Sequence, residues 1–137
     1  MKKHYALGMD FGTNSCRSLI VDLSGGKEVS SFVYDYSSGE KGVILDAKDP
    51  HPARKNPRDY ITGMEVSVKE AVKEAKQTRP GFESGAIIGI GVDTTGSSPM
   101  PVDQNGVPLG LKPSFQNNPM PWSGYGKTTP LSGRQMK

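Results

Sequence analysis

Apolar runs and polar turns alternate along the first third of the chain. Residues 5–9, 17–23 and 29–36 carry apolar, β-branched or aromatic side chains, and the polar segments 11–15 and 24–27 separate them. Runs of this length, bounded by glycine and small polar residues, predict β-strands. Because the connections are far too short for a crossover between parallel strands, we expect an antiparallel meander of three strands.

A change of hydrophobic period marks the middle of the chain. After a polar, proline-containing stretch at 39–55, which we expect to be a loop, Asn56 can cap a helix and Pro57 suits its first turn. The segment 79–81 ends this helix, and 87–92 follows as a glycine-containing strand. Within the predicted helix, apolar residues recur at helical spacing: Ile61, Met64, Val68, Ala71, Val72 and Ala75.

The last third of the chain is less regular. Residues 94–98 are small and polar, 100–103 predict a further short strand, and 104–106 form a turn. The predicted order of elements is therefore β-β-β-α-β-β. In 120–137 neither the helical nor the strand period is present, and aliphatic side chains are almost absent. We therefore divide the chain into 1–119 and 120–137.

Composition and charge narrow the classes of protein without identifying one. A chain of 137 residues fits a single domain, and its 17 basic residues nearly balance 14 acidic ones. The lysines of the predicted helix alternate with glutamates, so a solvated helix face explains them better than a nucleic-acid-binding patch. The apolar stretch 5–9 is too short for a signal peptide or a membrane span. Cys16 is the only cysteine, which suits a reducing compartment, and we expect a soluble, cytoplasmic protein.

The sharpest candidate site lies in the turn after the first predicted strand. Asp10 ends that strand, Gly12 lets the backbone turn closely, and hydroxyl and amide groups precede Arg17. Such a turn can direct backbone N–H groups at phosphate oxygens while the carboxylate holds a hydrated Mg²⁺. Phosphoryl transfer depends mainly on such positioning and charge neutralisation. Spacing alone leaves open an ordinary hairpin turn without a ligand.

A second segment repeats this arrangement at the end of the strand 87–92. Asp93 follows the strand and precedes the small polar residues 94–98. Two strands that present carboxylates and hydroxyls at the same edge of a sheet would line one cleft. Taken alone, the segment is explained equally well by a plain polar turn.

In their order along the chain, these segments resemble the N-terminus of the FGGY carbohydrate kinases. A proline-introduced helix, a strand with the pattern I-G-(I/V) and a D-x-x-G-x-P-L segment at 103–109 follow in the family's order. The segments 93–97 and 115–119 are similar to those of the ribulokinase branch of the family, and the resemblance covers about residues 5–119. The family's opening D-x-G-T-x-S-x-R loop is matched in full by Asp10, Gly12, Thr13, Ser15 and Arg17.

The resemblance implies a fold and a set of site residues. The fold is α/β, a partial actin-like (ribonuclease H-like) ATPase domain with a mixed β-sheet, and the cofactors are ATP and Mg²⁺. Asp10 would organise the Mg²⁺, while Gly96 and Ser97 would face the sugar. The implied ATP-phosphate-binding residues are Asp10, Gly12, Thr13, Asn14, Ser15 and Arg17.

The implied activity is phosphorylation of L-ribulose at O5, in arabinose catabolism, by a full-length kinase. Family members are several times longer, and their catalytic base, adenine-binding residues and second domain lie downstream of the matched segment. We therefore expect no catalytic base in this chain and little activity from it alone. Another pentulose or polyol kinase stays open, as does a non-catalytic nucleotide- or sugar-binding remnant.

The expected partner is the sugar substrate, with neither nucleic acid nor a membrane among the partners. A partial domain of this kind leaves sheet edges and apolar faces uncovered, and such surfaces promote pairing between chains. We therefore expect marginal stability or self-association into a homo-oligomer.

The tail departs from the family pattern after Pro119. Ribulokinases typically continue N-A-M-V-W-L-W-K-D-H-T, and plausible codons for that stretch, read from the second base, translate as M-P-W-S-G-Y-G-K-T-T-P. This is the sequence found at 120–130. We therefore interpret 120–137 as an aberrant tail translated in a shifted reading frame. The alternative is a genuine tail that diverges from the family.

Overall fold

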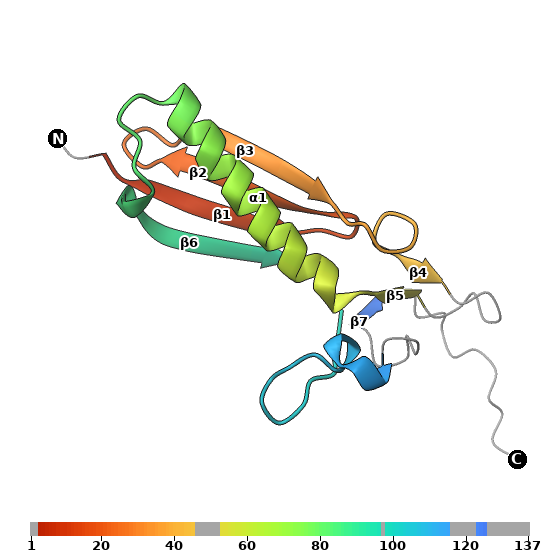
Figure 1. Ribbon diagram of the computed structural model, residues 1–137. Coiled ribbons are helices and arrows are strands. Elements are labelled where there is room, and N and C mark those ends of the chain that lie inside the picture. The colour runs from red at the N-terminus through yellow and green to blue at the C-terminus, as the bar shows by residue number, and fades with distance from the viewer. Residues whose placement is uncertain (1–2, 46–52, 97, 116–122, 126–137) are drawn as a thin grey trace, which may run out of the picture.

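A computed structural model describes residues 3–45, 53–96, 98–115 and 123–125 (Figure 1). Its main sheet has four strands in the order β3-β2-β1-β6. The first three strands along the chain pair antiparallel, as predicted, and β6 runs parallel to β1, so the sheet is mixed. The strands are β1 (Tyr5–Phe11), β2 (Ser15–Asp22), β3 (Lys27–Asp35) and β6 (Ile87–Thr94).

Helix α1 (Pro57–Thr78) lies diagonally across one face of this sheet (Figure 1). It begins where the sequence predicted, because the Asn56 side chain accepts a hydrogen bond of 3.0 Å from the Arg58 N–H. Its sheet-facing residues are small, which lets the helix backbone approach β2 and β3 closely. Those buried on α1 after its first turn are Gly63, Ser67, Ala71 and Ala75.

The predicted apolar stripe of α1 is therefore wrong in part. Ile61 and Met64 are 36% and 37% exposed, whereas Gly63 is buried between them. A Cβ added at Gly63 would lie 2.9 Å from the Cys16 Cβ. Close contact with the sheet selects the smallest side chains for the facing positions, and the larger apolar ones lie at the margin of the contact.

The hydrophobic core lies between α1 and the first three strands. Tyr5 and Ile20 of the sheet are fully buried and belong to one cluster with Ala71 of α1 and with Phe82. The Tyr5 and Phe82 rings pack edge to face, with centroids 4.9 Å apart. This cluster ties the segment after α1 back to the first strand.

A small polar group continues the contact between α1 and β2. The hydroxyls of Ser18 and Ser67 lie 2.7 Å apart, and the Cys16 sulfur lies 3.7 Å from the Ser67 oxygen. Burial raises the pKa of the Cys16 thiol, although the contact with Ser67 works in the opposite direction. Cys16 is therefore a buried packing residue with an unreactive, protonated thiol.

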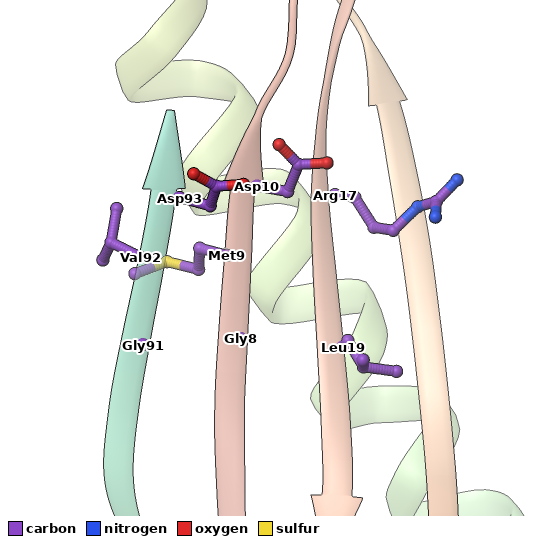
Figure 2. A pocket seen from close by; sticks show the side chains of 8 residues that line it. All are labelled: Gly8, Met9, Asp10, Arg17, Leu19, Gly91, Val92 and Asp93. Carbon is purple, nitrogen blue, oxygen red and sulfur yellow. The ribbon is translucent and has the colours of Figure 1, made fainter. Parts of the chain in front are cut away.

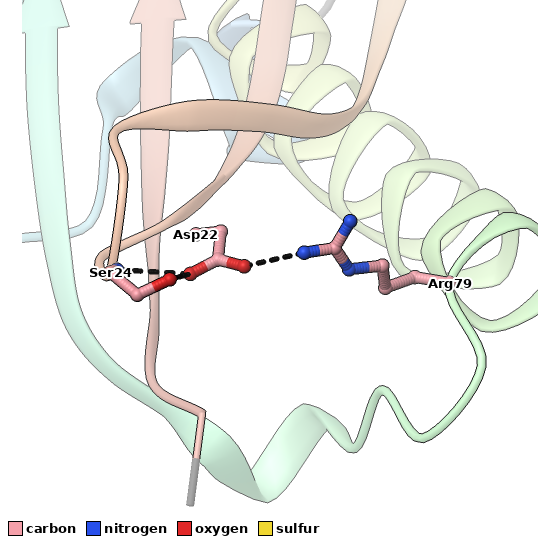
Figure 3. Close-up of polar contacts among 3 residues, drawn as sticks. All are labelled: Asp22, Ser24 and Arg79. Carbon is pink, nitrogen blue, oxygen red and sulfur yellow. Dashed lines mark hydrogen bonds and ion pairs between the residues drawn. The ribbon is translucent and has the colours of Figure 1, made fainter. Parts of the chain in front are cut away.

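The far end of the sheet is fastened by an ion pair (Figure 3). The Asp22 carboxylate accepts hydrogen bonds from the Ser24 hydroxyl at 2.6 Å and from its N–H at 2.9 Å. The Arg79 guanidinium donates to the other carboxylate oxygen at 2.6 Å. This contact fixes the C-terminal end of α1 against the end of β2.

A second, smaller sheet has the antiparallel order β4-β5-β7. Two of its strands fall within 39–55, so the prediction of a loop there was wrong in part. Strands of two and three residues are too short to show a period of two. The third lies within 120–137, where no period was found. The three strands of this smaller sheet are β4 (Ile44–Leu45), β5 (Ala53–Lys55) and β7 (Ser123–Tyr125).

The segment after β6 differs from its prediction. The short strand expected at 100–103 was wrong, because only an isolated bridge joins Val102 to Pro108. The short 3-10 helices are η1 (Ser84–Ala86), η2 (Leu109–Leu111) and η3 (Pro113–Phe115). None of the helices in the described parts of the chain is long and apolar enough to cross a membrane.

Candidate functional site

The parallel pairing of β1 with β6 sets the geometry of the candidate site. Asp10 pairs with Asp93 and Phe11 with Thr94, so the two strands end together at one edge of the sheet. Figure 2 shows both carboxylates at this edge. Ligands of open α/β sheets bind at the carboxyl ends of strands. The prediction that the two carboxylate-bearing segments meet is confirmed.

A hollow of about 470 Å³ adjoins the two carboxylates. Figure 2 views it with α1 behind the sheet, so the hollow lies on the face that α1 leaves uncovered. Gly8 and Gly91 pair across the two strands in this hollow and leave its floor without side chains. Asp10, Asp93 and Arg17 border it, and all three are exposed.

The Arg17 side chain lies at the rim of this hollow. Arg17 pairs with Asp10 across the β1–β2 hairpin. In Figure 2 its guanidinium nevertheless extends toward β3, away from the Asp10 carboxylate. Arg17 therefore borders the hollow without an ion pair to Asp10 in the described structure, which leaves its five N–H donors available to an anion.

The turn between β1 and β2 is held by its own backbone and by the segment after β3. The Gly12 N–H donates to the Ser15 carbonyl at 2.9 Å, and the Tyr36 N–H donates to the Asn14 carbonyl at 2.9 Å. The Asn14 side-chain amide donates to the Lys41 carbonyl at 2.8 Å. The Gly12 backbone N–H and the Asn14 side-chain amide are thus engaged within the fold.

Two backbone donors of the turn have no acceptor among the described residues. Neither the Thr13 N–H nor the Asn14 N–H donates to a backbone carbonyl of a described residue. Thr13 and Ser15 are half-buried, and Asn14 is exposed. Successive free N–H groups in a turn form a concavity suited to anions.

Sequence reasoning missed Lys55, the last residue of β5. Only 1% of its surface is exposed. Its ammonium donates to the Gly12 carbonyl at 3.3 Å and also to the Thr13 carbonyl. Lys55 stands directly before the helix cap, but nothing in the sequence spacing connects it with a turn more than forty residues earlier.

Two aromatic rings and a carboxylate complete the surroundings of Lys55. Its ammonium lies 5.3 Å from the centroid of the Tyr36 ring and 5.7 Å from that of the Tyr60 ring. Burial lowers the pKa of Lys55, while the nearby Asp59 acts in the opposite direction. The Asp59 carboxylate also accepts the Ser38 hydroxyl at 3.0 Å, which connects α1 with the segment after β3.

The turn after β6 is tied to the end of β1. Both the N–H and the hydroxyl of Thr95 donate to the Phe11 carbonyl, at 2.9 and 3.0 Å. Gly96 follows as an exposed residue, and Ser97 lies outside the described residues. A second hollow, of about 280 Å³, borders this turn and is lined by Phe11, Tyr60, Thr94, Thr95, Ser98 and Met100.

The donor set at the strand ends suits one kind of metal site. In the described part of the chain no three His, Cys, Asp or Glu residues gather as a self-sufficient metal site. Mg²⁺ keeps several waters and is usually bound through one or two carboxylates together with substrate phosphates. Asp10 and Asp93, adjacent and exposed, fit that requirement.

Comparison with known proteins relates the chain to sugar kinases. No family model matches it. It is 40% identical over 117 residues to a ribulokinase of Vibrio parahaemolyticus and 34% identical over 130 residues to that of Halalkalibacterium halodurans. These matches cover 85% and 89% of this chain. The chain spans about a fifth of the length of these curated relatives.

Solved structures show the same fold. A xylulose kinase from Brucella ovis superimposes with a TM-score of 0.62 at 19% identity, covering 77% of this chain and 19% of that one. A gluconate kinase from Lactobacillus acidophilus gives a TM-score of 0.59 at 18% identity, covering 79% and 19%. The mixed α/β fold is therefore that of the actin-like sugar kinases, as the sequence predicted.

Proposed function

Since the chain is a homologue of ribulokinases, we propose that it is the phosphate-binding first part of an ATP-dependent sugar kinase of the FGGY type. The observation that carries this proposal is the placement of Asp10 beside Asp93, next to a hairpin turn whose Thr13 and Asn14 N–H groups bond to no described residue. The carboxylates at the strand ends could hold a Mg²⁺ that neutralises phosphate charge, and the turn offers positioning. These are the two requirements of phosphoryl transfer.

The roles of the residues follow from their positions. Asp10, with Asp93 beside it, would hold a hydrated Mg²⁺, which lowers the charge repulsion between phosphate oxygens. The N–H groups of Thr13 and Asn14 would donate to phosphate oxygens. Arg17 would add a delocalised positive charge at the rim. Gly12 and Ser15 would shape the hairpin turn through their mutual hydrogen bond.

We assign the sugar to the turn after β6. Gly96 and Ser97 would face it, and the hollow between Phe11, Tyr60 and Thr95 offers apolar rings and hydroxyls side by side. The proposed substrate is L-ribulose, phosphorylated at O5 in a cytoplasmic arabinose pathway. The catalytic base is assigned to the part of the kinase not matched by this chain. The substrate alternatives are another pentulose or a polyol.

Nucleotide binding tests the phosphate site directly. Titration calorimetry should show MgATP binding to the 137-residue chain, and Asp10→Asn should weaken it at least tenfold because the Mg²⁺ carboxylate is lost. Glu65→Gln is the matched control, since Glu65 is an exposed carboxylate on α1, away from the turn. Equal affinity in wild type and Asp10→Asn would remove Asp10 from the site.

Turnover separates the enzyme from its alternatives. A coupled ADP-release assay on L-ribulose, other pentuloses and polyols should be run with the reading frame restored. Turnover fastest on L-ribulose supports the proposed substrate, and faster turnover on another sugar replaces it. MgATP binding with no turnover on any sugar would favour the non-catalytic remnant.

The tail carries a separate proposal, that 120–137 is read in a shifted frame. Most of this segment lies outside the described residues. Resequencing the coding DNA from the Asn118 codon onward tests the proposal. A one-base correction that restores the family sequence and a long open frame supports it. A confirmed frame that ends at Lys137 would make the tail a genuine divergent segment.

Self-association is proposed for β6, whose outer edge has no partner strand among the described residues. Ile90 and Val92 expose 65% and 59% of their surfaces there. Sedimentation velocity should show oligomers that increase with concentration and decrease in Ile90→Lys, because charge at a strand edge opposes pairing. A monomer at all concentrations would contradict this.

A further inference from the structure

We infer that Lys55 is a positioning residue for the phosphate-binding turn: by holding the carbonyls of Gly12 and Thr13, it aims the N–H groups of Thr13 and Asn14 at the bound anion. This inference rests on the proposed function and deepens it. It adds to the site a residue from β5, which lies outside the hairpin that carries the turn.

The geometry follows from the planarity of the peptide bond. In a trans peptide the C=O and N–H groups of one plane point in opposite directions. The Gly12 carbonyl shares its plane with the Thr13 N–H, and the Thr13 carbonyl shares its plane with the Asn14 N–H. Because one ammonium holds both carbonyls, both N–H groups point away from Lys55. Two successive peptides are thus oriented alike, which is what an anion-binding turn requires.

The N–H groups concerned are those that the described part of the fold leaves without an acceptor. The Gly12 N–H donates to the Ser15 carbonyl, whereas the N–H groups of Thr13 and Asn14 make no such bond to a described residue. Without Lys55, the two carbonyls would lose a charged donor, and rotation of either peptide would turn its N–H away from the anion.

Burial makes Lys55 suited to this task. An exposed lysine samples many conformations, but Lys55 is enclosed, with the rings of Tyr36 and Tyr60 on its flanks. Both rings stabilise the ammonium through their π faces. Its positive charge also lies behind the two peptides, where it polarises them so that their N–H groups become stronger donors.

The test compares Lys55→Met, which keeps most of the side-chain length but removes the ammonium, with Lys55→Gln, which keeps a neutral donor. Lys69→Met is the matched control because it removes one exposed charge on α1, away from the turn. Affinity for MgATP and for magnesium tripolyphosphate is measured by calorimetry. The amide signals of Thr13 and Asn14 are followed by ¹H–¹⁵N NMR in the ligand-free 137-residue chain.

We expect Lys55→Met to weaken both ligands at least tenfold and to shift the backbone amide signals of Thr13 and Asn14. Lys55→Gln should fall between wild type and Lys55→Met, and Lys69→Met should match wild type. Affinity within twofold of wild type in a folded Lys55→Met overturns the inference. If Lys55→Met does not fold, unchanged affinity in Lys55→Gln together with unchanged amides overturns it equally.

The two proposals fail in different ways. If wild type binds neither MgATP nor tripolyphosphate, the phosphate site itself is wrong, and the anion role of Lys55 falls with it. If wild type binds but the amides of Thr13 and Asn14 are the same with and without the Lys55 ammonium, the phosphate site stands and only the positioning role is overturned.

Discussion

Strands β2 and β6 differ in how far they are covered: β1 to β3 form a covered region under α1, and β6 forms an uncovered region. Ile20 on β2 is completely buried, whereas Ile90 on β6 exposes 65% of its surface. Both are isoleucines in the same sheet, and both strands are fully paired with β1. Helix α1 packs mainly against β2 and β3, and most of β6 lies beyond the helix (Figure 1). Pairing with β1 satisfies one edge of the β6 backbone, but only a second layer can bury its side chains.

The candidate site lies on the boundary between these two regions. Asp10 belongs to a strand packed under α1, and Asp93 belongs to the uncovered β6. The turn at Gly12 to Ser15 is held by the covered region through Lys55 and Asn14. We therefore expect changes in the covered region to act on stability and changes on β6 to act on binding or association.

The largest effect should come from the two isoleucines. Ile20→Ala leaves a cavity in the core and should lower the free energy of unfolding by about 2–5 kcal/mol. Ile90→Ala removes exposed surface and should change it by no more than about 0.5 kcal/mol. Urea unfolding followed by circular dichroism measures both. Similar losses in the two variants would mean that β6 is covered in solution.

A smaller loss should follow when the helix is pushed off the sheet. Gly63→Ala places a Cβ 2.9 Å from the Cys16 Cβ and 3.1 Å from the Tyr36 ring, so we expect a loss of about 1–3 kcal/mol. Helix propensity alone would favour alanine by about 1 kcal/mol, so a net loss reports the contact. Gly85→Ala is the control, because nothing lies within 4 Å of that Cβ. Stabilisation by Gly63→Ala would show that α1 sits farther from β2.

The sequence predicted the covered region better than the site. The strands of the meander and the capped helix have local signals, and their order and pairing are confirmed. The face of α1 was misjudged because tight packing chooses Gly63 and Ser67 over larger apolar residues. The short β4 and β5 have no period to detect.

At the site, the sequence predicted the strand ends but not the support behind them. Asp10 and Asp93 each end an apolar run, and parallel pairing brings them together. Lys55 is distant from Gly12 in the sequence and reaches it only because the chain folds. Its role at the turn therefore could not be derived from sequence spacing. The same holds for the engagement of the Asn14 side chain with the Lys41 carbonyl.

Acid should affect the covered region through Asp22. Hydrogen bonds from Ser24, and then the Arg79 guanidinium, hold the pKa of Asp22 below its usual range. A carboxyl with a lowered folded pKa stabilises the fold above its unfolded pKa of about 4 and loses this contribution as pH falls through the folded value. The thermal midpoint should therefore decrease as the pH is lowered below about 4, and this decrease should be less steep in Asp22→Asn. Asp35→Asn should follow wild type, and parallel curves for all three proteins would exclude Asp22 as the cause.

The smallest effect is expected beyond β6, at Asp103. The Lys112 ammonium, 2.6 Å away, and the Val107 N–H lower the pKa of Asp103 to about 2. Its contribution is likewise present above about pH 4 and lost toward pH 2. The pair holds only the loop that follows β6, where no core residue lies, so its loss should open that loop without unfolding the sheet. Lys112→Met should speed exchange of the Val107 amide and leave the thermal midpoint unchanged. A lowered midpoint would show that this loop helps to hold the sheet together, and the contrast between covered and uncovered regions would no longer stand.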